Sequence, residues 1–185
     1  MKYTGNAGFS HNQADKIGVL ITNLGTPQAP TKGALKPYLK EFLSDPRVVE
    51  VPRLIWWFIL NGIILNIRPK RSAEAYASVW SEQGSPLMVH TKAQAEALAK
   101  RCEREFGDDV IVDFAMRYGE PAVNKVIERM LSNGVRKLLV VPMYPQYSAS
   151  TVGSTFDAIA TDFQQRRWLP DFRFVSHYHD RPGYI

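Results

Sequence analysis

Three groups of polar and aromatic residues each follow an apolar run that is typical of a buried strand. They are Gly25, Thr26 and Pro27, then Arg117 and Tyr118, and then the hydroxyl-rich run 144–151 (YPQYSAST). Glycine lets a flat ligand approach the backbone closely. Arginine pairs with carboxylates, tyrosine stacks on rings, and loop amides and hydroxyls bind anions. These residue types indicate a planar, anionic ligand.

Each group also has a purely structural interpretation. Residues 25–27 could form an ordinary turn between a strand and a helix, and Arg117 and Tyr118 could be a surface cation and a half-buried ring. Ser85 would cap the helix that follows it, while the same helix start would favour an anion. Both interpretations of Ser85 can hold together.

An apolar segment is followed at once by a cluster of cations. Residues 54–67 (LIWWFILNGIILNI) precede Arg68, Lys70 and Arg71. An apolar wall beside a cationic edge fits an amphiphile that carries carboxylates. A solvated helix start, or cations that contact lipid head groups, would give the same sequence pattern. The segment is shorter than the roughly 20 residues of a bilayer span. We therefore expect a buried helix pair or an interfacial lip.

Several common active sites are excluded by their missing motifs. The chain has no Gly-x-Gly-x-x-Gly, no Gly-Lys-Ser/Thr and no Gly-x-Ser-x-Gly. His177 and His179 would point to one side of an extended strand and could bind a metal as a pair, but spacing fixes no third ligand, although Asp180 is adjacent. The single cysteine, Cys102, allows no internal disulfide and no iron–sulfur cluster, which suits the reducing cytoplasm.

The pattern of apolar residues alternates between strands and helices. Strands are predicted over residues 16–24, 110–116, 137–142 and 172–176, and helices over 33–43, 70–81, 86–106, 120–133 and 152–167. This order predicts an α/β, Rossmann-like fold: a parallel sheet of about four strands flanked by helices on both faces. Ligands of such sheets bind beyond the carboxyl ends of the strands, where the three groups above would converge.

Composition narrows the class of protein. The 185 residues are 45% hydrophobic and 22% charged, which suits one folded domain. A net charge of +5 and a pI of about 9.3 suit an anionic substrate or an acidic membrane surface. Nucleic acid is not predicted as a partner, because the cations are scattered among carboxylates. Residues 1–15 are polar and lack the apolar core of a signal peptide, so we expect a flexible leader.

Four short segments in order give the chain a family resemblance. They are residues 24–27 (LGTP), 84–87 (GSPL), 117–119 (RYG) and 144–148 (YPQYS), supported by 39–49 (LKEFLSDPRVV) and the Trp56-Trp57 pair. In this it resembles the N-terminal half of ferrochelatases, most closely those of proteobacteria. The resemblance implies insertion of Fe²⁺ into protoporphyrin IX to form protohaem, the last step of haem biosynthesis. The porphyrin would bind between two chelatase-type α/β halves and be distorted from planarity.

The resemblance also implies which residues bind. Leu24, Gly25, Thr26 and Pro27 would line one face of the porphyrin; Arg68, Tyr76 and Ser85 would meet its propionate side or mouth; Arg117, Tyr118, Tyr144, Tyr147, Ser148 and Ser150 would contact the macrocycle region. Residues 56–65 would form the apolar lip through which a membrane-partitioned porphyrin enters. No metal ligand and no permanently bound cofactor is implied, since Fe²⁺ is a substrate.

The chain departs from the family pattern in one respect. The family's histidine and glutamate would lie beyond Ile185, so residues 16–185 are expected to be an N-terminal α/β domain whose C-terminal partner is absent, with no catalytic residue of its own and little activity alone. General-base chemistry at neutral pH needs a group such as histidine. Alternatives are a porphyrin- or haem-binding module, a small dimeric chelatase that uses His177 or His179 as its base, and an α/β protein whose lip only touches lipid. Self-association and a place in the cytoplasm, peripheral to the inner membrane, are further expectations.

Overall fold

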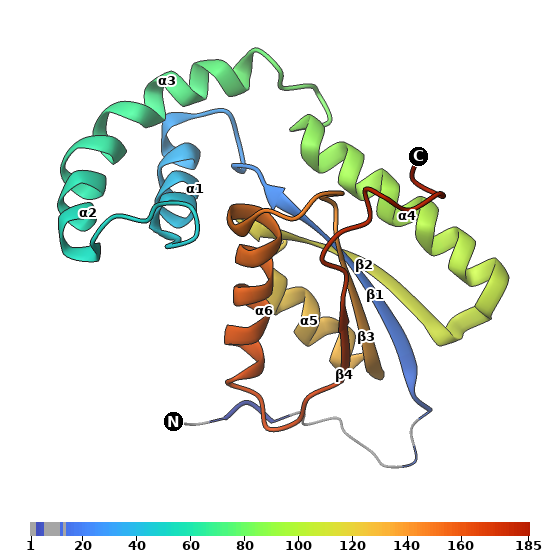
Figure 1. The fold of residues 1–185 in the computed structure, drawn as a ribbon. Coiled ribbons are helices and arrows are strands. Elements are labelled where there is room, and N and C mark those ends of the chain that lie inside the picture. Colours follow the sequence, from blue (N-terminus) through green and yellow to red (C-terminus); the bar gives the residue numbers. More distant parts are fainter. Residues whose placement is uncertain (1–2, 6–11, 13) are drawn as a thin grey trace.

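A four-stranded parallel sheet forms the centre of the protein in a computed structural model, which describes residues 3–5, 12 and 14–185. The strands are β1 (Lys16–Gly25), β2 (Val110–Tyr118), β3 (Val135–Pro142) and β4 (Asp171–Phe174), in the order β2-β1-β3-β4 (Figure 1). The predicted α/β fold with a parallel sheet is confirmed.

Helices cover both faces of this sheet. Helix α4 (Pro86–Phe106) lies on one side of the strands, and α5 (Val123–Ser132) and α6 (Ser154–Phe163) lie on the other (Figure 1). On the α5 and α6 face, Leu20 packs into a core that includes residues of both helices. On the opposite face, the Asn23 amide donates to the Thr91 hydroxyl of α4 at 3.0 Å. The helix pattern expected of crossover connections is therefore present.

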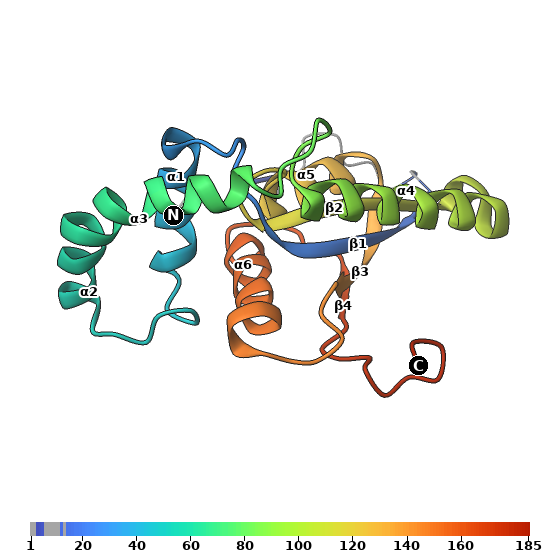
Figure 2. The same cartoon turned by 90° about the horizontal axis from the view of Figure 1, so that it is seen from above.

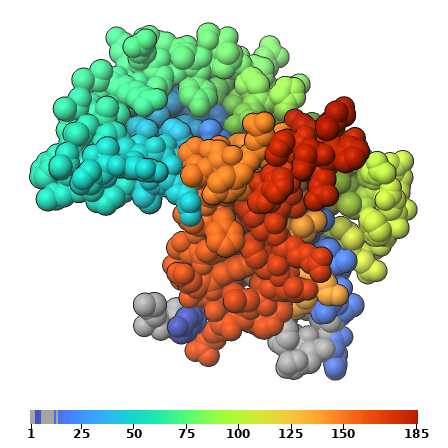
Figure 3. Space-filling model, in the orientation of Figure 1, coloured from blue at the N-terminus to red at the C-terminus, as the bar shows by residue number. Residues whose placement is uncertain are grey.

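Three helices form a lobe beside the carboxyl ends of the strands. They are α1 (Lys32–Ser44), α2 (Arg53–Ile59) and α3 (Leu65–Ala77), and a π-helical turn, Leu60–Ile64, joins α2 to α3. Figures 2 and 3 show this lobe projecting from the body formed by the sheet and its helices. A second apolar core joins the lobe to the end of β2. It contains leucines of α1, of the π-helical turn and of α3, together with the buried ring of Tyr118.

Several predicted boundaries differ from the structure by a few residues, among them the end of the last strand, which is at Phe174 rather than residue 176. The helix pair expected within residues 54–67 is not separated at Asn61-Gly62, because the π-helical turn continues the helix and Asn66 bonds to the Gly62 carbonyl at 2.9 Å. Helix α3 consequently begins five residues before the predicted residue 70 and contains Pro69. Strand β2 extends to Tyr118, because Gly25 and Tyr118 still pair at the end of β1 and β2.

The expected flexible leader is anchored at one described point. The Thr4 amide donates to the Gln165 carbonyl at 2.8 Å, and the Arg167 amide donates to the Thr4 carbonyl at 3.0 Å. The rest of that prediction concerns mainly residues 1–2, 6–11 and 13, which lie outside the described residues. Among the helices that the structure describes, none is both long and apolar enough to cross a membrane.

Candidate functional site

Gly25 is required by the contact between two strand ends. Its φ is +111°, and a Cβ at this position would lie 1.9 Å from the Tyr118 carbonyl oxygen. A φ in this range is easy only for glycine. The need for glycine here thus comes from the close approach of β2, whatever ligand lies above it.

A cavity of about 450 Å³ opens between the end of β1 and the start of α4, lined among others by Thr26, Pro27, Trp80, Ser85 and Met88. Thr26 is 4% exposed, and within the described part of the chain its hydroxyl has no hydrogen-bond partner. Ser85 precedes α4 and is also 4% exposed, and its side chain makes no cap bond to the described residues of the helix. Open helix amides and an unpaired hydroxyl suit an anion.

One carboxylate also lines this cavity but is already engaged. Glu120 accepts from Lys125 Nζ at 2.5 Å and from the Ala122 amide at 3.1 Å. The hydrogen bond from Lys125 lowers the pKa of Glu120, with the Ala122 amide as the next cause. The cavity therefore combines free donors with a carboxylate that its neighbours have neutralised.

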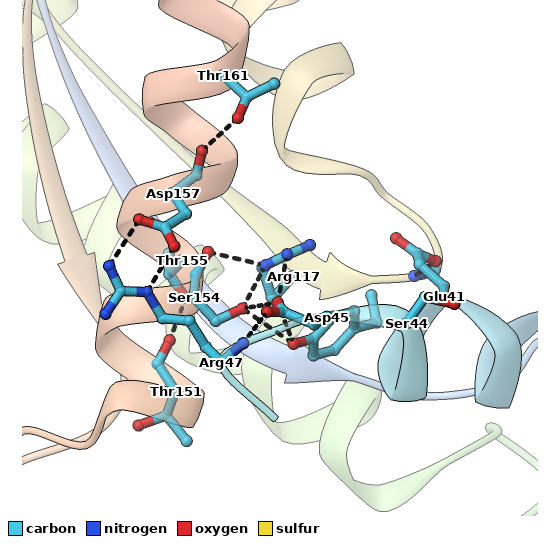
Figure 4. Close-up of polar contacts among 12 residues, drawn as sticks. Glu41, Ser44, Asp45, Arg47, Arg117, Thr151, Ser154, Thr155, Asp157 and Thr161 are labelled. Carbon is cyan, nitrogen blue, oxygen red and sulfur yellow. Dashed lines mark hydrogen bonds and ion pairs between the residues drawn. The ribbon is translucent and has the colours of Figure 1, made fainter. Parts of the chain in front are cut away.

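Asp45, just after α1, is the centre of a buried polar network (Figure 4). Its Oδ2 accepts from Arg117 Nη2 at 2.7 Å, from the Tyr118 hydroxyl at 2.8 Å and from the Ser154 hydroxyl at 2.5 Å. Its Oδ1 accepts from the Arg47 amide at 2.8 Å. Burial alone would raise the pKa of Asp45, but the hydrogen bonds from Ser154, Arg47 and Tyr118 and the charge of Arg117 lower it.

Arg117 and Tyr118 are held by this network. Arg117 Nε donates to the Ser154 carbonyl at 2.9 Å and to its hydroxyl at 2.7 Å, and the guanidinium lies 4.4 Å from the centre of the Tyr118 ring. Tyr118 is 0% exposed, and burial raises the pKa of its phenol. This burial corrects the expectation that Tyr118 presents its ring to a ligand, as well as the alternative of a half-buried ring.

Arg117 opens onto a different cavity from Ser85. A space of about 750 Å³ lies between α1, α5 and α6, and Arg117, Asp45 and Asp157 are among its lining residues. Asp157 forms a two-bond pair with Arg47, with Nη2 to Oδ1 at 2.9 Å (Figure 4). The residues predicted to meet one ligand are therefore divided between separate cavities in this structure.

The loop after β3 has a buried beginning and an exposed continuation. The Tyr144 hydroxyl is buried without a hydrogen-bond partner among the described residues, and burial raises the pKa of its phenol. Tyr147 is exposed, and the Ser148 and Ser150 hydroxyls lie 3.1 Å apart just before and inside the π-helical turn Ala149–Gly153. The Ser148 and Ser150 hydroxyls are thus accessible to a ligand at the carboxyl edge of the sheet.

The two residues expected on α3 lie in different surroundings. Arg68 is exposed in a groove of about 500 Å³ with Ile63, Ile67 and Arg71. Tyr76 is half-buried and meets the Tyr38 ring edge-on at 6.4 Å, and the Tyr38 hydroxyl donates to the Gly25 carbonyl at 3.1 Å. Only Tyr76 is thus linked to the end of β1.

The apolar segment after residue 53 has an inner and an outer face. Trp56 donates its indole N–H to the Leu43 carbonyl at 2.6 Å, while Leu60 and Leu65 are buried. The outward side chains are Leu54, Ile55, Trp57, Phe58, Ile63 and Ile67; we call them the lip. Trp57 and Phe58, 58% and 62% exposed, pack edge to face at 5.0 Å. Of the lip predicted over residues 56–65, Trp57, Phe58 and Ile63 are thus exposed, whereas Leu60 and Leu65 are buried.

The histidine pair lies near the end of the chain. The His177 and His179 rings are 5.8 Å apart, and His177 Nδ1 lies 2.9 Å from the Ser176 hydroxyl. Across the described residues, no three histidine, cysteine, aspartate or glutamate side chains come together in a group that could hold a metal. The pair therefore has no third ligand among the residues that the structure describes.

Asp45 was not predicted as a site residue, since it lies just beyond the helix predicted over residues 33–43. The one available signal was its place in the 39–49 segment that carries the resemblance. Its partners Tyr118 and Ser154 are 73 and 109 positions away, so no local pattern could have identified the network.

Comparisons with known proteins agree with this resemblance. The ferrochelatase family model matches residues 16–185. Ferrochelatases of Idiomarina loihiensis, Pseudoalteromonas atlantica and Marinobacter nauticus are 68%, 65% and 63% identical over all 185 residues, which make up 51%, 51% and 50% of those proteins. The chain thus spans about half the length of these curated relatives. It belongs to the ferrochelatase family.

Proposed function

We propose that this chain supplies the porphyrin-binding N-terminal half of a ferrochelatase, which inserts Fe²⁺ into protoporphyrin IX. The match over residues 16–185 supports the reaction class, and the half-length coverage of relatives supports the restriction to one half. The base that removes the pyrrole protons would lie outside these residues. On its own, the chain would bind porphyrin and leave the metal uninserted, with Fe²⁺ as a substrate rather than a resident cofactor.

The cavity beside Ser85 is the observation that carries this proposal. Its unpaired Thr26 hydroxyl and the open first turn of α4 are donors without a described acceptor, as a propionate would require. A carboxylate at a helix N-terminus is stabilised by the helix amides and dipole. The backbone of residues 24–27 would then lie against one face of the macrocycle, with Tyr76 at its mouth.

The remaining contacts would come from the other strand ends. Tyr144, Tyr147, Ser148 and Ser150 would meet the macrocycle region, with Arg117 below it. Tyr118 would act from behind, through its contacts with Arg117 and the Asp45 network. Residues held by packing and hydrogen bonds can impose distortion on a bound ring because they do not yield to it.

The lip is proposed to face the membrane from which porphyrin arrives. Its six apolar side chains are exposed, and Arg53, Arg68 and Arg71 flank them. An apolar surface with flanking cations binds anionic bilayers both by burying apolar area and by electrostatic attraction to the lipid head groups. A peripheral location at a membrane surface follows from this proposal, with the Arg68 groove receiving anionic head groups or porphyrin carboxylates.

Esterified porphyrin provides the sharpest test. The fluorescence of protoporphyrin IX should be quenched on titration with the chain. Its dimethyl ester should bind at least about tenfold more weakly, since hydrogen bonds to charged groups contribute roughly 1.5–3 kcal/mol. Ser85→Ala should weaken binding of the free acid and leave that of the ester unchanged. Equal binding of acid and ester by the unmodified chain would contradict the propionate site.

A binding module without any link to metal insertion is the second candidate, favoured by the engaged state of Arg117 and Tyr118. The two candidates differ in what happens when the C-terminal half of a ferrochelatase is added. Mixing the chain with the C-terminal half of a close relative should restore metallation if the chain is half of a chelatase. A dimeric chelatase would instead metallate alone and lose activity with His177→Ala or His179→Ala.

A further inference from the structure

The proposed function assigns Arg117 to the ligand but leaves its nearest anion, Asp45, without a role. The Asp45 side chain is 4% exposed, and the Arg117 side chain is 18% exposed. They lie 72 positions apart in sequence, with Asp45 after α1 and Arg117 near the end of β2. A carboxylate that joins the lobe to the sheet at this point could set how Arg117 is presented.

The geometry around Arg117 leaves one part of the guanidinium free. Nε is bound to Ser154, and Nη2 is bound to Asp45. Nη1 makes no hydrogen bond to any described residue, and Arg117 lines the 750 Å³ cavity. Because the guanidinium is planar and its donors form a rigid fork, fixing two nitrogens fixes the direction of the third.

The geometry around Asp45 admits only a carboxylate. Oδ2 accepts three donors, and Oδ1 accepts the Arg47 amide. Asparagine has a single side-chain oxygen. In Asp45→Asn, the donors on either the Oδ1 or the Oδ2 side would therefore face an NH₂ group, which is itself a donor and cannot accept from them. Removing the charge therefore must break one side of the network.

We infer that Asp45 is a positioning residue, which fixes the Arg117 guanidinium through Nη2 and so directs Nη1 into the 750 Å³ cavity that Arg117 lines. This inference rests on the proposed function in its assumption that Arg117 meets the porphyrin. Tyr118 and Ser154 complete the same support, by donating to Asp45 and, for Ser154, accepting from Arg117. Asp45 itself makes no ligand contact in this role.

The position of Arg117 can be followed without a ligand. In ¹⁵N-labelled chain, the Arg117 Nε–Hε signal, assigned by its disappearance in Arg117→Lys, should be shifted by its bonds to Ser154 and protected from hydrogen exchange. Asp45→Asn should move this signal and reduce its protection about tenfold or more, since a hydrogen bond to a charged group contributes roughly 1.5–3 kcal/mol. Asp113→Asn is the matched control, because Asp113 also binds an arginine, Arg129, through Oδ2 and a backbone amide through Oδ1. An unchanged Arg117 signal in both Asp45→Asn and Asp45→Ala, the second of which removes both oxygens, would overturn the inference.

A second variant covers the case in which Asp45→Asn does not fold. Ser154→Ala keeps the bond from Nε to the Ser154 carbonyl and the bond from Nη2 to Asp45. If Asp45 positions Arg117, the Nε–Hε signal should stay protected in Ser154→Ala. Loss of protection there would show that the Ser154 hydroxyl holds Arg117, and would overturn the inference.

Porphyrin affinity separates this inference from the proposed function. With protoporphyrin IX, Asp45→Asn should weaken binding by about as much as Arg117→Ala, and the double variant should bind no worse than either, as expected of residues that act together. Additive losses, or unchanged affinity in Asp45→Asn, would overturn the positioning role. Failure of the unaltered chain to bind any porphyrin would overturn the proposed function, while the Arg117 signal would still test Asp45.

Discussion

Gly25→Ala should destabilise the protein through two separable effects. The first is the φ of +111°, which costs a residue with a side chain about 1–2 kcal/mol. The second is the Cβ itself, which would lie 1.9 Å from the Tyr118 carbonyl and force β1 and β2 apart at their ends. Overpacking of this kind costs roughly 1–3 kcal/mol. We expect the free energy of unfolding to fall by about 3 kcal/mol, and Tm by roughly 6–12 °C for a chain of this size.

Two other glycines separate these terms. Gly84 has nearly the same φ, +112°, but a Cβ there meets nothing within 4 Å, so Gly84→Ala should cost only the conformational part. Gly33 lies in α1 with open space around it, and Gly33→Ala should stabilise by about 0.5–1 kcal/mol. Urea unfolding of the three variants at neutral pH measures all of these values. A Gly25→Ala loss no larger than that of Gly84→Ala would refute the close contact of the strand ends.

Three further predictions concern the network, the cavity and the lip. The folded-state pKa of Asp45 is lowered from 3.8, so its contribution to stability is present above that value and is lost as the pH falls through the folded pKa. The unfolding free energy of Asp45→Asn should therefore depend less steeply on pH below about 4 than that of the unaltered chain. Equal pH slopes for the two proteins would contradict this. Thr26→Val removes a buried hydroxyl without a described partner. It should leave the free energy of unfolding unchanged or raise it by about 1 kcal/mol, while weakening binding of protoporphyrin IX. A loss of stability would show that the hydroxyl is paired. Replacing Trp57 and Phe58 by serine should reduce sedimentation with anionic vesicles and leave Tm within about 2 °C, and unchanged sedimentation would remove the lip from membrane binding.

The sheet could be predicted from sequence because its signals are local. Residues 16–24 form a short, mostly apolar and β-branched run, residues 137–142 are almost continuously apolar, and Gly107 stands at the C-cap of helix α4. The helix between Trp56 and Tyr76 was less predictable. Its Asn61-Gly62 pair normally indicates a break, but a π-helical turn and side-chain bonds to freed carbonyls carried the helix through.

The candidate site was predictable by segment and not by side-chain role. Strand order brings the ends of β1, β2 and β3 to one edge, as the alternating pattern indicated. The direction of each side chain depends on partners far away in sequence. Tyr118 turns inward because Asp45 and Ser154 bind its hydroxyl and Phe42 packs on its ring at 5.1 Å. Burial of this kind is a tertiary property, which periodicity does not record.

An anaerobic titration of the purified chain with protoporphyrin IX and Fe²⁺, followed through the Soret band, tests the central proposal most directly. We expect a perturbed porphyrin spectrum, saturable with protein concentration, and metallation no faster than in protein-free solution. An unperturbed spectrum would contradict porphyrin binding by this half. Metallation well above the protein-free rate would contradict the assignment of the proton-accepting base to residues outside this chain.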